Sequence, residues 1–167
     1  MKRLVTASIL GTVLWLSGCG NSALLMLDKD EHFKSSLDLT HKQQLKNKAG
    51  ETLGLFRATY LNPIYPDEYS DLQYFFVGIH LQDDLAAPQA GIHNPHYRLS
   101  MNDLNVSRIE DVSENDPLYK RMPLVERWTH YYVVAFDDNA SAKLGLLYKK
   151  DTNESLKFSF PRYIKPE

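Results

Sequence analysis

The sequence predicts an all-β sandwich. Short runs rich in aromatic and β-branched residues recur along the chain, several of them alternate apolar and polar side chains, and turn-forming residues separate them. A chain of 167 residues that is 43% hydrophobic and 24% charged has the length and composition of one globular domain. Its 10 tyrosines and 7 phenylalanines suit such a core, because aromatic side chains bury a large area each.

The first expected strands form a hairpin followed by a central strand. Residues 39–45 and 52–61 flank a polar turn with Asn and Gly, and Asn62-Pro63 ends the second run. Residues 73–82 (QYFFVGIHLQ) are the most strand-like segment of the chain. Because the centre of this segment is apolar on both faces, we expect a central strand that is covered on both sides.

The C-terminal half predicts five further strands. They are expected at residues 97–101, 104–112, 130–136, 143–149 and 156–160. In the second of these, Leu104, Val106 and Ile109 are expected to point inward. Two prolines in residues 113–123 argue against a long helix there, and residues 124–129 are predicted to form one helical turn or the start of the next strand.

These elements amount to about seven or eight short antiparallel strands. Before them, residues 21–39 have partly helical apolar spacing, which predicts a short N-terminal helix or a structured tether. Two long loops, 83–95 and 113–123, favour a Greek-key sandwich over an up-and-down barrel. The pattern resembles the immunoglobulin-like β-sandwiches of extracytoplasmic bacterial proteins, although the inter-sheet cysteine pair of true immunoglobulin domains is absent.

The N-terminus has the organisation of a secretory leader. Lys2 and Arg3 precede the largely apolar residues 4–16, a segment shorter than a transmembrane helix needs. It ends in Leu16-Ser17-Gly18-Cys19, which resembles the lipobox of bacterial lipoproteins, and Cys19 is the only cysteine in the chain. The resemblance implies acylation of the Cys19 thiol, with palmitate among the acyl groups, and cleavage of the chain before it. An uncleaved anchor, or a secretory signal with an incidental cysteine, is the alternative.

The lipobox interpretation divides the chain into three parts. Residues 1–18 are the signal peptide, residues 19–38 are the lipidated N-terminus with a tether or short helix, and residues 39–167 are a single β-sandwich domain. Acylation leaves no thiol for a disulfide, a nucleophile or a cysteine metal site, so core packing alone must hold the domain. The resemblance places the domain at a membrane of the cell envelope. Gly20 stands where an aspartate would resemble an inner-membrane retention signal, which favours the outer membrane. We expect the domain to face the periplasm.

Charge and motifs exclude several classes of function. The formal charge is −2, and the leader contributes two cations and no acid, so no nucleic-acid partner is expected. No G-x-S-x-G or H-E-x-x-H motif occurs. We therefore predict that the chain is not an enzyme and uses no cofactor. An envelope hydrolase with an unrecognised pair of acids is one alternative.

Two kinds of residues are candidate metal ligands. His93 and His96 lie three apart in a loop bounded by glycine and proline, and imidazoles bind Zn²⁺, Cu²⁺ or Ni²⁺, but His80 or His130 would have to supply a further ligand from another strand. A small-ligand or metal-binding lipoprotein that uses this loop is a second alternative function, and a solvated loop is the competing interpretation. Acidic clusters in residues 67–71, 110–116 and 137–139 lack the EF-hand spacing and are interpreted as solvated turns.

A candidate partner surface lies between residues 119 and 128. Its aromatic and basic side chains are typical of binding hot spots and suit a protein partner or an anionic surface: Tyr119, Lys120, Arg121, Arg127 and Trp128. The loop 62–69 (NPIYPDEY) has a similar character. The alternative is that Trp128 caps the sandwich core while the basic residues are solvated. The function predicted from all these features is a membrane-anchored, non-enzymatic lipoprotein that binds or supports another envelope component.

Overall fold

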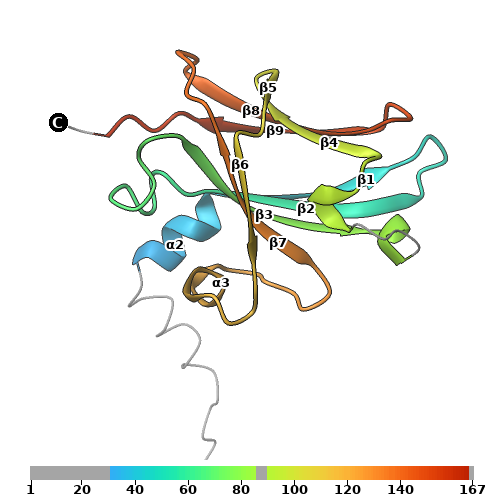
Figure 1. Ribbon diagram of the computed structural model, residues 1–167, viewed down its shortest axis with the longest axis horizontal. Coiled ribbons are helices and arrows are strands. Elements are labelled where there is room, and N and C mark those ends of the chain that lie inside the picture. The colour runs from blue at the N-terminus through green and yellow to red at the C-terminus, as the bar shows by residue number, and fades with distance from the viewer. Residues whose placement is uncertain (1–30, 86–89, 166–167) are drawn as a thin grey trace, which may run out of the picture.

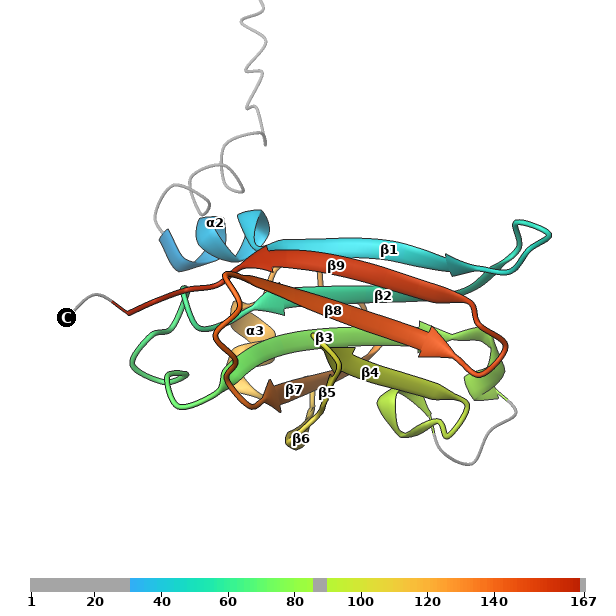
Figure 2. The same cartoon turned by 90° about the horizontal axis from the view of Figure 1, so that it is seen from above.

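The described residues, 31–85 and 90–165, form a sandwich of two antiparallel sheets in the computed structural model (Figure 1). One sheet contains, in spatial order, β1 (Thr40–Lys46), β2 (Thr52–Tyr60), β3 (Gln73–Leu81), β7 (His130–Phe136) and β6 (Arg108–Val112). The other contains β5 (Leu104–Asn105), β4 (Tyr97–Met101), β8 (Lys143–Lys150) and β9 (Ser155–Pro161), and Figure 2 looks onto its outer face. The predicted all-β sandwich is confirmed. Within the described ranges, no helix has the length and apolar character needed to span a membrane.

The strand order is that of an immunoglobulin-like sandwich with one additional strand. Strands β2, β3, β7 and β6 occupy the places of A, B, E and D, while β5, β4, β8 and β9 occupy those of C′, C, F and G. The extra strand, β1, pairs with β2 at the edge of the five-stranded sheet. Short 3-10 helices η1 (Gln82–Leu85) and η2 (Gly91–His93) lie in the connection between β3 and β4.

One predicted strand is divided between the two sheets. Residues 104–112 form β5 in the four-stranded sheet and β6 in the five-stranded sheet, so the chain crosses the sandwich at Val106 and Ser107. Leu104 and Val106 pack against the core as expected. The expectation for Ile109 is wrong, because its side chain is exposed on the edge strand β6.

The main core lies between the sheets. Alternate side chains of β4, β8 and β9 point into it, as their sequence pattern predicted. Phe75, which is fully buried on the central strand β3, contacts the rings of Tyr60, Phe136 and Phe160. The interior is therefore filled largely by aromatic rings, which bury much apolar surface per residue.

A second apolar cluster covers the opposite face of the five-stranded sheet, and it is called the outer cluster below. The alternate residues of β3 belong to it, which confirms that this strand is covered on both sides. Loop residues such as Ile64 and Tyr65 pack on the sheet here together with Leu118 of α3 (Pro117–Arg121). Figure 1 shows α3 and α2 (Glu31–Asp38) on this side of the sheet, away from the four-stranded sheet.

Two residues fix where α3 begins. The carboxylate of Asp116 accepts a hydrogen bond from the Leu118 backbone N–H at 2.7 Å, and Pro117 occupies the first turn of α3. The predicted absence of a long helix in residues 113–123 is confirmed. Residues 124–129 form turns, so both a helical turn and an early start of β7 were wrong expectations there. The predicted N-terminal helix is present as α2, whereas Cys19 and the rest of residues 1–30 lie outside the described part.

Candidate functional site

The residues of the predicted partner surface gather around α3 but do not form one patch. Tyr119 and Arg127 line the same hollow of about 180 Å³ with Thr129. Arg121 lines a different pocket, and Trp128 contacts His80 instead. The structure therefore brings Tyr119 and Arg127 together and separates Arg121 and Trp128 from them. Lys120 is exposed on α3.

The loop 122–129 exposes two large apolar side chains. Trp128 is 50% exposed and Leu124 is 57% exposed, so Trp128 does not cap the sandwich core. Leu124 also has a φ of 60°, in the left-handed region that leucine rarely adopts. A conformation of this kind persists only where the surrounding structure imposes it, and such residues concentrate at functional sites.

Contacts on both sides of Leu124 hold the loop in place. Met122 is buried in the outer cluster, and Val125 packs against it. The Glu126 backbone N–H donates to the Tyr131 hydroxyl at 2.8 Å, and the Thr129 N–H donates to the Glu126 carbonyl at 3.1 Å. These contacts tie the loop to β7 and leave the side chains of Leu124 and Trp128 in solvent.

A buried cation lies beneath the loop. The Arg57 side chain of β2 is almost completely buried, donates a hydrogen bond to the Tyr131 hydroxyl at 3.2 Å, and lies 3.6 Å from the Glu126 carboxylate. Lys42 of β1 contacts the same carboxylate at 3.1 Å. A buried guanidinium needs a counter-charge, because a charge removed from water without a partner is strongly unfavourable. The ion pair thus couples the backbone position of the 122–129 loop to the middle of the sheet.

Trp128 is oriented by its neighbour on β3. The His80 Nδ1 donates to the Trp128 carbonyl oxygen at 3.1 Å, and the two rings meet edge to face with centroids 4.6 Å apart. One side of the indole is therefore supported while the other remains in solvent. A tryptophan held in this way is pre-organised, which reduces the conformational entropy that its binding to a partner would remove.

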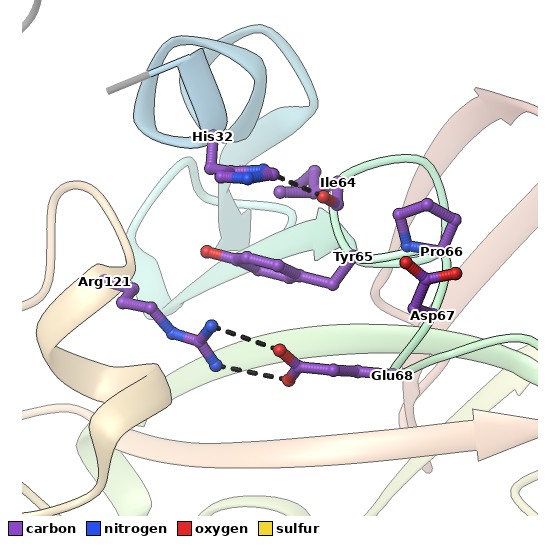
Figure 3. Close-up of a pocket in the computed structure, with 7 residues that line it drawn as sticks. All are labelled: His32, Ile64, Tyr65, Pro66, Asp67, Glu68 and Arg121. Atoms are coloured by element: carbon purple, nitrogen blue, oxygen red, sulfur yellow. Dashed lines mark hydrogen bonds and ion pairs between the residues drawn. The ribbon is translucent and has the colours of Figure 1, made fainter. Parts of the chain in front are cut away.

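Figure 3 shows the second pocket, which α2, α3 and the 62–69 loop enclose. It has a volume of about 250 Å³. The Tyr65 ring lies between the His32 ring, at 5.3 Å, and the Arg121 guanidinium, at 4.5 Å. Arg121 also donates two hydrogen bonds to Glu68, each 3.3 Å long, and these raise the pKa of its guanidinium above the ordinary value. Because Glu68 neutralises the cation, this stack joins the two helices to the loop and leaves no unpaired charge for an anion.

Tyrosines near α3 remain neutral well above physiological pH. Burial, followed by the repulsion of Glu68, raises the pKa of Tyr69 to about 12. Burial also raises the pKa of Tyr119. A neutral phenol can donate one hydrogen bond and accept others but does not act as a general base near pH 7. Tyr69 and Tyr119 therefore serve as uncharged hydrogen-bonding groups near α3 at pH 7.

The candidate metal ligands are directed at separate carboxylates. His93 lies 3.5 Å from Asp111, and His96 lies 3.2 Å from Asp151. In residues 31–85 and 90–165, no three His, Cys, Asp or Glu side chains are grouped so that they could hold a metal ion. Acids of the predicted turns have other partners, since Asp67 pairs with Lys165 and Asp138 with Arg162.

Three residues that shape or support the 122–129 loop were not identified from the sequence: Arg57, Leu124 and Glu126. Arg57 carried a usable signal, because a single cation in the apolar run of β2 must find a buried partner if the run is covered. Glu126 and Leu124 carried none, since their roles depend on contacts with other elements.

No family model, curated protein or solved structure matches the chain. The function is therefore inferred from the chemistry and geometry of these surfaces.

Proposed function

We propose that the chain is a non-enzymatic lipoprotein of the bacterial envelope that is anchored through Cys19 and docks a protein partner on its 122–129 loop. The leader and Leu16-Ser17-Gly18-Cys19 support the anchor, and Gly20 supports the outer membrane, where we place the domain on the periplasmic side. The observation that carries the docking role is the exposure of Leu124 and Trp128 on a loop held by the Glu126–Arg57 ion pair. A pre-organised, solvent-exposed tryptophan is typical of a binding hot spot.

A protein partner fits this loop better than a small ligand does. Small-molecule sites are concave and enclose most of their ligand. Leu124 and Trp128 are instead exposed at the surface, and neither lines one of the pockets described above. Such side chains gain free energy by entering a pocket on a partner, and Arg127, which is exposed beside Trp128, can supply a polar contact at the rim.

Photo-crosslinking in cells tests the docking role. With a photoreactive amino acid at position 128, we expect one discrete adduct whose partner is an identifiable envelope protein. The matched control is the same amino acid at Ser159, an exposed position on β9 of the other sheet, where this adduct should be absent. Leu124→Ser should reduce the adduct by about fivefold or more, because it removes the second apolar contact while the chain stays folded. The same products from both positions, a self-adduct, or no effect of Leu124→Ser would contradict the proposal.

Acylation tests the anchor separately. The parent chain should incorporate labelled palmitate and fractionate with membranes washed in 0.5 M salt, whereas Cys19→Ser should incorporate none and leave this membrane fraction, because the thiol that carries the acyl chains is gone. Ser17→Ala, which keeps a small residue at that position, is the control and should behave as the parent does. A Cys19→Ser chain that stays in the membrane fraction would show that the leader is an uncleaved anchor.

A further inference from the structure

On the outer face of the four-stranded sheet, the charged side chains that point outward from β4, β8 and β9 are all cations. Its outward-pointing positions on β4, β8 and β9 include Arg98, Lys143, Lys149 and Lys157, all of them exposed. The other outward positions on these strands are serine, glycine, leucine or proline, and none is acidic. We call the surface formed by these four cations the basic face. It stands out because the whole chain has a formal charge of −2.

The strand register places three of these cations close together. Arg98 is directly opposite Lys149 in the β4–β8 pair. Lys157 is opposite Leu147, which makes it a diagonal neighbour of Lys149. Like charges that face each other across a sheet repel and destabilise it. An anion bound over the three side chains would relieve that repulsion.

The cations of the basic face have no ion-pair partner in the described part of the chain. The salt bridges of the described residues use other cations, among them Arg57 and Arg121. None of these salt bridges involves the four residues of the basic face. Arg98 and Lys149 instead line a shallow hollow of about 270 Å³ with Ser100 and Leu147. Asp151 at its end contacts His96, so the middle of the face has no carboxylate of its own.

We propose that the basic face docks on a bilayer containing anionic phospholipids. Ser100, Gly145 and Ser159 are small, so the cations project from a smooth sheet surface, and attraction to such a bilayer needs no shaped partner. The preference for a bilayer over an acidic protein rests on the proposed anchor at Cys19. Residues 20–30 separate Cys19 from α2 and can span at most about 36–40 Å, which keeps the domain near the membrane surface. Because α2 lies on the same side of the sandwich as α3, this segment must pass the edge of the sandwich before the basic face meets the lipid, and stacked sheets are only about 10 Å apart. Figures 1 and 2 show that α3 lies on the opposite side of the sandwich, so the loop that follows it would face away from the lipid.

Vesicle co-sedimentation tests this docking without the acyl anchor. The full chain carrying Cys19→Ser is mixed with vesicles of phosphatidylcholine alone or with added phosphatidylglycerol. Adding K149Q/K157Q should weaken binding to the anionic vesicles by about fivefold or more, and 0.5 M salt should remove this difference. The matched variant K46Q/K48Q removes two exposed cations from the β1–β2 hairpin and should stay within about twofold of the parent. Every protein carries the same leader, so its contribution cancels.

Two further measurements keep the result interpretable. Lys149→Gln should raise the midpoint of thermal unfolding slightly, because it removes the repulsion with Arg98, and this shows that the variant is folded. Equal losses for the two double variants, or equal binding of the parent to both kinds of vesicle, would overturn the proposal. So would poly-glutamate that binds the basic face while anionic vesicles do not, since the partner would then be an acidic protein. The vesicle test and the palmitate test can also give different answers. If Lys149 and Lys157 support binding to anionic vesicles but the chain is not acylated in cells, the basic-face proposal is supported and the anchor is rejected.

Discussion

Replacing Phe75 with alanine is expected to lower the free energy of unfolding by about 4 kcal/mol. Phe75 is fully buried at the centre of the main core and contacts three other aromatic rings, those of Tyr60, Phe136 and Phe160, at centroid distances of 5.0, 6.0 and 5.3 Å. Alanine would remove the apolar area of the ring and leave a cavity that these rigid neighbours cannot fill. Urea denaturation followed by tyrosine and tryptophan fluorescence would measure the change.

Two other substitutions provide the comparison for the loss of stability in Phe75→Ala. Phe75→Leu keeps much of the buried volume and should be less destabilising than alanine, by roughly 2 kcal/mol. Ile109→Ala lies on the edge strand of the same sheet, where the side chain is exposed, and should change stability by less than about 0.5 kcal/mol. A cost of Phe75→Ala as small as that of Ile109→Ala would mean that the two sheets are not packed as described.

The strands were predictable because a strand pattern is local. Side chains that alternate in sequence must alternate in space, so Leu156, Phe158 and Phe160 could be assigned to one buried face without knowing what covers it. The same reasoning failed at residues 104–112, where the pattern looks continuous. The Ser107 N–H donates to the Ala135 carbonyl oxygen at 2.8 Å, and this pairing with a distant strand is where the chain changes sheets.

The candidate surface was predictable in part. Residue type alone pointed to Trp128 as a contact residue, and its exposure agrees with that. Residue type also grouped Arg121 with Trp128, yet Arg121 turns to Glu68, which is 53 residues earlier in the chain. Likewise the contact of Arg57 with Tyr131 spans 74 residues, so the support beneath the 122–129 loop depends on long-range packing that no local pattern encodes.

The basic face, unlike Trp128, could not be singled out from residue type. Arg98, Lys149 and Lys157 are unremarkable in sequence because each lies on a different strand, as one outward position of an alternating pattern. Only the pairing of β4 with β8 and of β8 with β9 makes them adjacent. A cluster of like charges of this kind therefore emerges from sheet register, whereas the aromatic character of Trp128 is visible as a residue type.

Replacing Glu126 with alanine is expected to destabilise the chain by about 3 kcal/mol and to weaken the attachment of the 122–129 loop to the sheet. The substitution leaves the Arg57 guanidinium buried without a counter-charge, and its Nε is already buried without a hydrogen-bond partner. The second cation on the same carboxylate is the control. Lys42 is 42% exposed, so Lys42→Gln should change stability by less than about 1 kcal/mol. Denaturant unfolding measures both, and crosslinking from position 128 should fall only in the Glu126 variant.

A double substitution separates the ion pair from the loop backbone. Because the penalty in Glu126→Ala comes from an unpaired buried charge, Arg57→Met in the same chain should restore most of the lost stability, about 2 kcal/mol. Neither substitution removes the hydrogen bond from the backbone N–H of residue 126 to the Tyr131 hydroxyl, so the loop keeps this contact with β7. Crosslinking at position 128 should therefore recover together with stability. Recovery of stability without crosslinking would show instead that the Glu126 carboxylate itself contacts the partner, and no recovery of either would show that Arg57 stabilises the sheet independently of Glu126.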